Sequence, residues 1–135
     1  MASDHIKKLC LELDLEVPKK EKDKSYTIEF RDDIVVKLWE LNPGFYFHSN
    51  LIMCPTKNKE DLFIYLMRAN LMGIGTGRAR IGIDIEEKFL TLSDDMPYEI
   101  KYNEFKEKLE NFVNFVTFWK KEIERFNQLA EKTIL

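Results

Sequence analysis

The carboxyl-terminal part of the chain carries the sequence feature that most limits its possible folds. Its apolar residues recur in steps of four and three: Phe105, Leu109, Phe112, Val116, Trp119, Ile123 and Phe126. This spacing predicts one long helix, from about Asn103 to Lys132, with a single apolar face. Val113, Phe115 and Phe118 widen that face with bulky groups, which favours packing on a β-sheet. The heptad steps also suit a two-stranded coiled coil.

The middle of the chain supplies that sheet. Apolar and polar residues alternate there, as in half-buried strands, and turn residues separate the runs at Asp32-Asp33 and at Asn42 to Gly44. A second alternating region turns at Glu86-Glu87. These patterns predict a three-stranded antiparallel meander followed by a hairpin. The predicted strands cover residues 26–30, 34–41, 45–53, 80–85 and 88–92.

Two further helices are predicted. The first runs over residues 3–17 and ends before Pro18, with a main apolar stripe and a smaller ridge formed by Leu11 and Leu15. The second covers roughly residues 59–72 and is apolar nearly all round; after Asp61 its only charged residue is Arg68. Such a helix must be covered on more than one side. The sheet of a small chain covers one side, and a second subunit is the natural cover for the other.

Together these elements predict one α+β domain spanning residues 1–135, in the order α-β-β-β-α-β-β-α. We expect an antiparallel twisted sheet with the helices packed on one face. The length of 135 residues is sufficient for one domain with one core.

Composition restricts the classes of partner. A net charge of −3 argues against a nucleic-acid partner, because phosphates require a basic face. The chain lacks the roughly 20 consecutive apolar residues of a membrane span, and its first residues do not resemble a signal peptide. Cys10 and Cys54 form no CxxC pair and are expected to be ordinary small apolar residues in a reducing compartment. We therefore expect a cytoplasmic protein that contacts no membrane.

The glycine-rich stretch "NLMGIGTGRARIGID", residues 70–84, resembles a phosphate-binding loop at first sight. However, it follows a predicted helix and precedes a strand, and the carboxyl end of a helix dipole repels phosphate. It also lacks the Lys-Ser/Thr pair of a P-loop. We instead expect Gly73 to cap the second helix, and Gly75, Gly77 and Gly82 to permit bends or close backbone contacts.

Catalytic and metal-binding patterns find no support either, so no cofactor is expected and the chain is not predicted to be an enzyme. His5 and His48 lie far apart with no ligand-like spacing, and His48 is expected to be a hydrogen-bonded structural residue. His48 and Cys54 would lie about 20 Å apart along one strand, too far for a catalytic pair. The adjacent acids Glu86-Glu87 and Asp94-Asp95 are expected at exposed turns.

What remains is apolar surface, which suits a protein that binds an extended polypeptide. Three stretches then resemble the Tir chaperone (CesT) family, the class I chaperones of type III secretion. "LFIYLMRANLMG", residues 62–73, resembles the second helix of the family. "GRARIGIDIEEKFLTLSDD", residues 77–95, resembles its following hairpin, and "FKEKLENFVNFVTFWKKEIE", residues 105–124, resembles its last helix. Their order, more than any single motif, carries the resemblance.

The resemblance implies a homodimer that binds, without ATP, the extended N-terminal segment of a secreted effector and keeps it soluble and competent for export from the bacterial cytoplasm. The implied dimer interface comprises Phe63, Leu66, Met67, Asn70, Leu71, Ile81 and Ile83. The expected effector-binding residues are Ile6, Leu9, Leu11, Leu13, Ile28, Val35, Trp39 and Phe47. Two alternatives stay open: a related adaptor that binds a folded regulator or export component, and a small-ligand-binding α+β domain.

Overall fold

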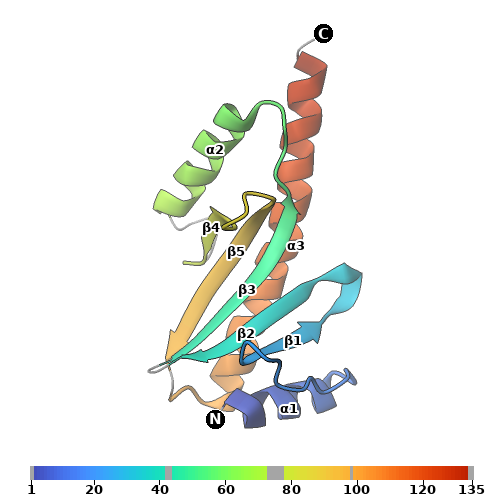
Figure 1. The fold of residues 1–135 in the computed structure, drawn as a ribbon, viewed down its shortest axis with the longest axis vertical. Coiled ribbons are helices and arrows are strands. Elements are labelled where there is room, and N and C mark those ends of the chain that lie inside the picture. Colours follow the sequence, from blue (N-terminus) through green and yellow to red (C-terminus); the bar gives the residue numbers. More distant parts are fainter. Residues whose placement is uncertain (1, 42–43, 73–77, 98, 134–135) are drawn as a thin grey trace.

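A computed structural model describes residues 2–41, 44–72, 78–97 and 99–133. The predicted order of helices and strands is confirmed, with one additional short 3-10 helix (Figure 1). The elements are α1 (Ala2–Glu12), β1 (Ser25–Glu29), the 3-10 helix (Arg31–Asp33), β2 (Val35–Leu41), β3 (Gly44–Met53), α2 (Lys59–Met72), β4 (Arg80–Ile83), β5 (Phe89–Pro97) and α3 (Tyr102–Thr133).

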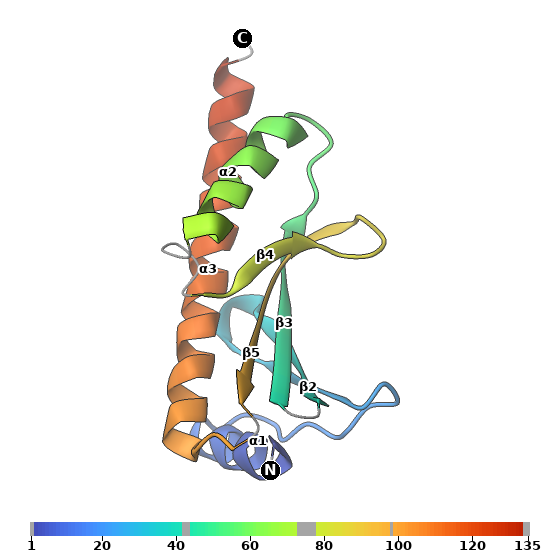
Figure 2. The same cartoon turned by 90° about the vertical axis from the view of Figure 1, so that its left-hand side faces the viewer.

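The five strands form one antiparallel sheet in the order β1-β2-β3-β5-β4. The meander and the second hairpin join where β3 pairs with β5, a ladder in which Phe47 lies opposite Asp94. The long helix α3 follows one face of this sheet, with α1 at one end and α2 near the other (Figures 1 and 2). Because β1 and β4 each pair on one side only, they are the two edge strands.

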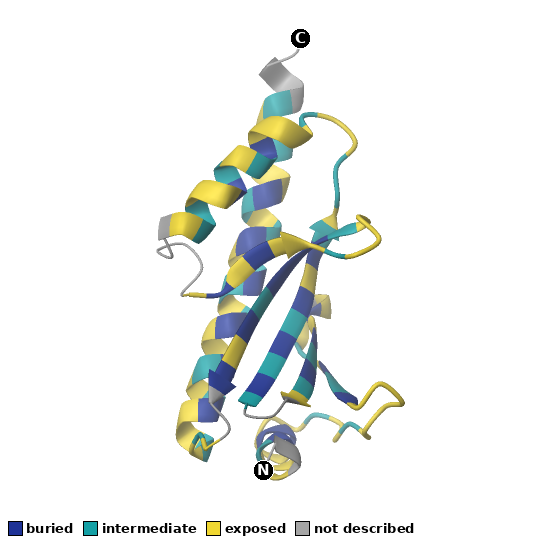
Figure 3. Ribbon diagram, turned by 60° about the vertical axis from the view of Figure 1, so that its left-hand side comes forward, coloured by how far each residue is buried: buried dark blue, intermediate teal, exposed yellow. Residues whose placement is uncertain are grey.

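The heptad stripe of α3 packs on the sheet, as its aromatic content predicted. Six of its residues are at most 2% exposed: Phe105, Leu109, Phe112, Val116, Trp119 and Ile123. Phe112 meets Phe47 of β3 edge to face, with ring centroids 4.7 Å apart. Figure 3 shows the buried side of α3 turned toward the sheet. Phe126 lies farther along α3, where its ring stacks on Tyr65 of α2.

The first helix is shorter than predicted, because α1 ends at Glu12 and not before Pro18. Asp14 adopts a left-handed conformation with φ of 56°. The amide of Leu15 donates to the carbonyl of Cys10 at 2.8 Å, and the amide of Asp14 donates to Leu11. This pair of bonds is a Schellman cap, which here uses aspartate in place of the usual glycine. The prediction followed the apolar spacing and Pro18 and missed this cap.

Hydrogen bonds join α1 to α3 and to the segment before it, at the end of the sheet where α1 lies (Figure 1). His5 Nε2 lies 2.8 Å from the carbonyl oxygen of Ile100. The Tyr102 hydroxyl donates to Glu12 at 2.9 Å, and Lys106 approaches the same carboxylate at 3.0 Å. Burial and the neighbouring Glu12 raise the pKa of Tyr102 to about 12. These contacts fix α1 against α3 while Leu11 remains exposed.

The second hairpin is also longer than predicted on its β5 side. Glu86 and Glu87 do form the turn, and Asp84 Oδ1 accepts the amides of Lys88 and Phe89. Asp94 and Asp95, however, lie within β5 and not at a turn. Asp94 is buried, which raises the pKa of its carboxyl; the Asp95 amide and Lys108, 3.9 Å away, act in the opposite direction.

Most of the glycine cluster, including Gly73, Gly75 and Gly77, lies outside the described residues. Gly82 is described, in the middle of β4. A Cβ placed on it would meet Thr91 Oγ1 at 3.6 Å, an ordinary van der Waals contact. The close backbone approach expected at Gly82 is therefore not required by its neighbours within the protomer.

Candidate functional site

The first candidate surface is an apolar stripe on α2. Leu62 and Leu66 bury one side of this helix, while Ile64, Met67 and Leu71 leave the opposite side exposed. Residues three and seven positions apart share a helix face, so these three side chains line up. Ile83 of β4 is also exposed. We call Ile64, Met67, Leu71 and Ile83, with the half-buried Phe63 and Asn70, the α2–β4 face.

A cavity of about 190 Å³ lies between α2 and β4 within this face. Phe63, Leu66 and Met67 line it from the helix, and Ile81 and Ile83 line it from the strand. A broader hollow extends along Ile64 and Leu71 toward two arginines, Arg68 and Arg80. Large apolar side chains thus remain uncovered over two adjacent elements, an arrangement typical of a protein-binding surface.

The structure divides the seven residues predicted for the dimer interface. Met67, Leu71 and Ile83 are exposed, with 68%, 85% and 43% of their surface accessible. Phe63 and Asn70 are half-buried, whereas Leu66 and Ile81 belong to the protomer core. Ile64 is as exposed as Ile83 but was missed, because periodicity does not tell which side of an all-round apolar helix meets the sheet.

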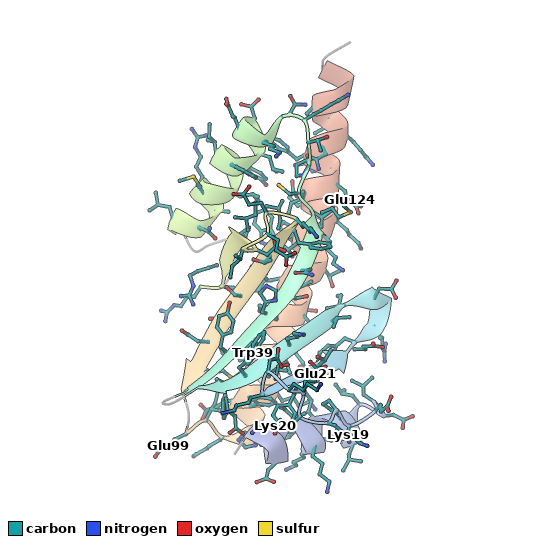
Figure 4. The ribbon with its side chains drawn as sticks, in the orientation of Figure 1. Lys19, Lys20, Glu21, Trp39, Glu99 and Glu124 are labelled. Carbon is teal, nitrogen blue, oxygen red and sulfur yellow. The ribbon has the colours of Figure 1, made fainter. Side chains whose placement is uncertain are left out.

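The second candidate surface is the side of the sheet opposite α3. We call Val35, Lys37 and Trp39 of β2, with Tyr46 and His48 of β3, the outer sheet face. The Trp39 ring lies 5.7 Å from Tyr46 and 6.4 Å from His48, centroid to centroid. Figure 4 shows Trp39 in front of the sheet, near Lys20 and Glu21, with α3 behind.

The chain between α1 and β1 covers part of this surface with polar groups. Lys37 Nζ lies 3.7 Å from Glu21 and 3.6 Å from Asp23, and 5.9 Å from the Trp39 ring centroid. The Ser25 hydroxyl donates to Glu21, and the Ser25 amide donates to Asp23. A cavity of about 540 Å³ opens beyond Lys37, lined by Val35, Trp39, His48, Asn50 and Ile52 among others. The surface therefore combines aromatic and aliphatic groups with hydrogen-bonding groups.

The structure also divides the eight residues predicted for effector binding. Leu11, Leu13 and Val35 are exposed, and Trp39 is half-buried on the outer sheet face. The other four, Ile6, Leu9, Ile28 and Phe47, are at most 1% exposed. These four side chains pack in the protomer core, so they offer no surface to an effector in this conformation. Tyr46 and His48 lie beside Trp39 and were not predicted for this site.

His48 is held differently from the prediction. Its ring contacts Trp39 edge-on, and no hydrogen bond joins it to another described residue. The neighbouring Ser49 points to the opposite side of the sheet and donates to the carbonyl of Val35. Burial is the main cause that lowers the pKa of His48. The charge of Asp84 raises this pKa by a smaller amount, and the charge of Lys37 lowers it.

The lowered pKa predicts a specific pH dependence. In the unfolded chain His48 binds a proton near pH 6.5, whereas in the folded protein it binds one only at lower pH. The free energy of unfolding therefore falls as the pH drops below 6.5, and it stops falling below the lowered pKa of folded His48. His48→Gln should remove the contribution of His48 to this fall in the free energy of unfolding. Urea unfolding between about pH 7.5 and about pH 5.5 tests it. Equal pH slopes for the two proteins would contradict it.

The described residues offer little basis for metal binding, for thiol chemistry or for a membrane-spanning helix. In the described part of the chain, no three His, Cys, Asp or Glu side chains converge in a way that could hold a metal ion. Cys10 is fully buried and Cys54 is half-buried, and both are free thiols. Burial raises the pKa of the Cys10 thiol, which disfavours the reactive thiolate. No described helix combines the length and apolar character that crossing a bilayer requires.

Several solved structures share this fold. The ExsC-ExsE complex aligns with a TM-score of 0.73 at 13% identity, over 89% of this chain and 91% of that one. The HopA1-SchA chaperone-effector complex gives 0.70 at 10%, over 89% and 93%. The Yersinia pestis type III secretion chaperone SycH, bound to a fragment of YscM2, gives 0.66 at 14%, over 88% and 99%. No curated protein sequence matches the chain.

The fold is therefore that of the type III secretion chaperones. The family model described as "Tir chaperone protein (CesT) family" matches residues 4–120, and the chain belongs to this family. The resemblance seen in the sequence is confirmed at the level of family and fold.

Proposed function

We propose that this protein is an ATP-independent chaperone of type III secretion that binds the N-terminal chaperone-binding region of a secreted effector. In the bacterial cytoplasm it keeps that effector soluble and competent for export. The observation that carries the proposal is the pair of uncovered apolar surfaces, on α2–β4 and on the outer side of the sheet, in a chain of the CesT family. The HopA1-SchA and ExoU-SpcU structures, which share the fold, are complexes with partner proteins.

The α2–β4 face forms the homodimer in this proposal. Met67 and Leu71 project from α2 without a cover in the protomer, and their burial between two copies removes apolar area from water. A two-fold axis brings the same face of each copy together, so each side chain of the interface is buried in both copies. The cavity between α2 and β4 then accepts apolar side chains from the second copy.

The effector binds to the outer sheet face and to the exposed end of α1. An extended segment has alternating side chains, which suits a surface where Val35 and Trp39 project from the same side of β2. Leu11 and Leu13 add exposed apolar groups at the end of α1. A disordered effector segment buries its apolar side chains as it wraps around the chaperone, and it loses conformational entropy when it becomes ordered there. Binding and release then require neither a cofactor nor a catalytic group.

Trp39→Ala tests the effector surface. Aromatic anchors in desolvated positions dominate binding, so we expect the affinity for an effector N-terminal segment to fall by roughly 30-fold, about 2 kcal/mol. The measurement is titration calorimetry with the N-terminal segment of a secreted protein encoded beside this chain. Phe118→Ala is the matched control, because Phe118 is an exposed aromatic residue on α3. Equal losses in both variants would contradict the assignment.

The same titration separates the alternatives. If the protein ignores effector N-terminal segments but captures a folded regulator or export component, the adaptor function is supported instead. A shift in melting temperature with nucleotides or phosphorylated metabolites would support a small-ligand-binding domain.

A further inference from the structure

The strand β4 has an unusual neighbour along its outer edge. The Asn70 side chain of α2 reaches Ile81 with both of its polar atoms. Its Nδ2 donates to the carbonyl oxygen of Ile81 at 2.7 Å, and its Oδ1 accepts the amide of Ile81 at 2.7 Å. A carboxamide that donates and accepts in this way makes the same two bonds that a residue of a neighbouring antiparallel strand would make.

The register of β4 shows that this contact lies on the free side of the strand. The amide of Asp84 donates to the carbonyl oxygen of Phe89 in β5. Because backbone groups alternate in direction along a strand, Gly82 and Arg80 also direct theirs toward β5. Ile81 and Ile83 lie between them and direct their N–H and C=O groups outward. Because β4 is an edge strand, these are the groups that another strand would pair with. Asn70 occupies those of Ile81.

We propose that Asn70 is an edge-closing residue: its carboxamide takes the place of a sixth strand at Ile81 and prevents the β4 edge from pairing with a strand of a second copy of this chain. The second copy then docks on the α2–β4 face through side chains alone. This inference rests on the dimer proposed above, but the closure of the edge is a property of the protomer. Within the α2–β4 face, Asn70 is thus a positioning residue for self-association, and its neighbours supply the apolar contact.

The surroundings of β4 explain why closure matters. Met67 and Ile83 flank Asn70 around the same cavity, so a second copy seated on this face brings its own chain close to the β4 edge. The opposite edge of the sheet is β1. An open β4 edge offers its free N–H and C=O groups to the β1 edge of another copy, and such a head-to-tail contact repeats without end unless its rotation closes a ring. Asn70 therefore favours a closed dimer over open-ended growth.

Amide hydrogen exchange of the full-length protein tests the closure. In the wild type, the Ile81 amide should exchange slowly although β5 does not bond it. In Asn70→Ala it should exchange about tenfold faster, while the Gly82 amide, which faces β5, stays protected. Asn70→Asp keeps an acceptor for the Ile81 amide but sets a second carboxylate oxygen against the Ile81 carbonyl, so it should retain only part of the protection. Asn114→Ala, an exposed asparagine on α3, is the matched control.

Light scattering over a concentration series tests the consequence. Asn70→Ala should form species larger than the dimer, whereas the wild type, Asn70→Asp and Asn114→Ala should not. An unprotected Ile81 amide in the wild type overturns the proposal, even if Asn70→Ala fails to fold. Faster exchange in Asn70→Ala without larger species overturns the gatekeeping role. If the wild type is a monomer, the proposed dimer fails, and larger species in Asn70→Ala alone still support the closure.

Discussion

Met67→Asp is expected to dissociate the proposed dimer into monomers while the protomer stays folded. Met67 is 68% exposed in the protomer, so aspartate there remains in water when the chain is alone. In the proposed dimer, the two-fold axis would bury an unpaired carboxylate from each copy, and a buried unpaired charge costs about 3–5 kcal/mol. The dimer dissociation constant should rise by at least about 100-fold. Sedimentation at micromolar concentration measures it.

Two comparisons make this test specific. Ile85→Asp changes an equally apolar and fully exposed residue in the β4–β5 turn, which points away from α2 in the view of Figure 2. It should leave the dimer intact. Leu66→Asp should unfold the protomer, because Leu66 is only 4% exposed and packs in the core. A Met67→Asp protein that sediments as a dimer would place the interface elsewhere.

Phe47→Ala is expected to destabilise the protomer by about 3–5 kcal/mol, the range for a large aromatic side chain removed from a core. Phe47 is fully buried, and its ring meets Phe112 edge to face at the centre of the sheet–helix contact. Such a loss is a large part of the roughly 5–15 kcal/mol that stabilises a small domain. Urea unfolding followed by circular dichroism measures it.

The matched comparison for Phe47→Ala is Trp39→Ala on the outer sheet face. Trp39 is half-buried and contacts Tyr46 and His48, so its removal should cost less stability while it weakens effector binding. The two variants thus separate a core residue from a surface residue that the sequence grouped together. A small stability loss for Phe47→Ala would show that the sheet–helix core tolerates its removal.

Much of the fold followed from local patterns. The predicted range of the second helix, residues 59–72, coincides with α2, and the buried residues of α3 are those of its four-and-three stripe. Periodicity succeeds here because one apolar face on a long helix requires one cover. The end of α1 was wrong because a left-handed Asp14 terminates it, a conformation that spacing does not reveal. Asp94 was misplaced because buried acids in strands are rare.

The candidate surfaces required the structure. The sequence alone determined that α2 is apolar on more than one side, so this helix needs a cover beyond the sheet of its own chain. Only the tertiary structure decided that Val36 and Leu38 face α3 while Val35 and Trp39 face outward. The physical reason is that successive side chains point to opposite faces of a strand, but this alternation does not determine which of the two faces is buried. That choice depends on where α3 packs.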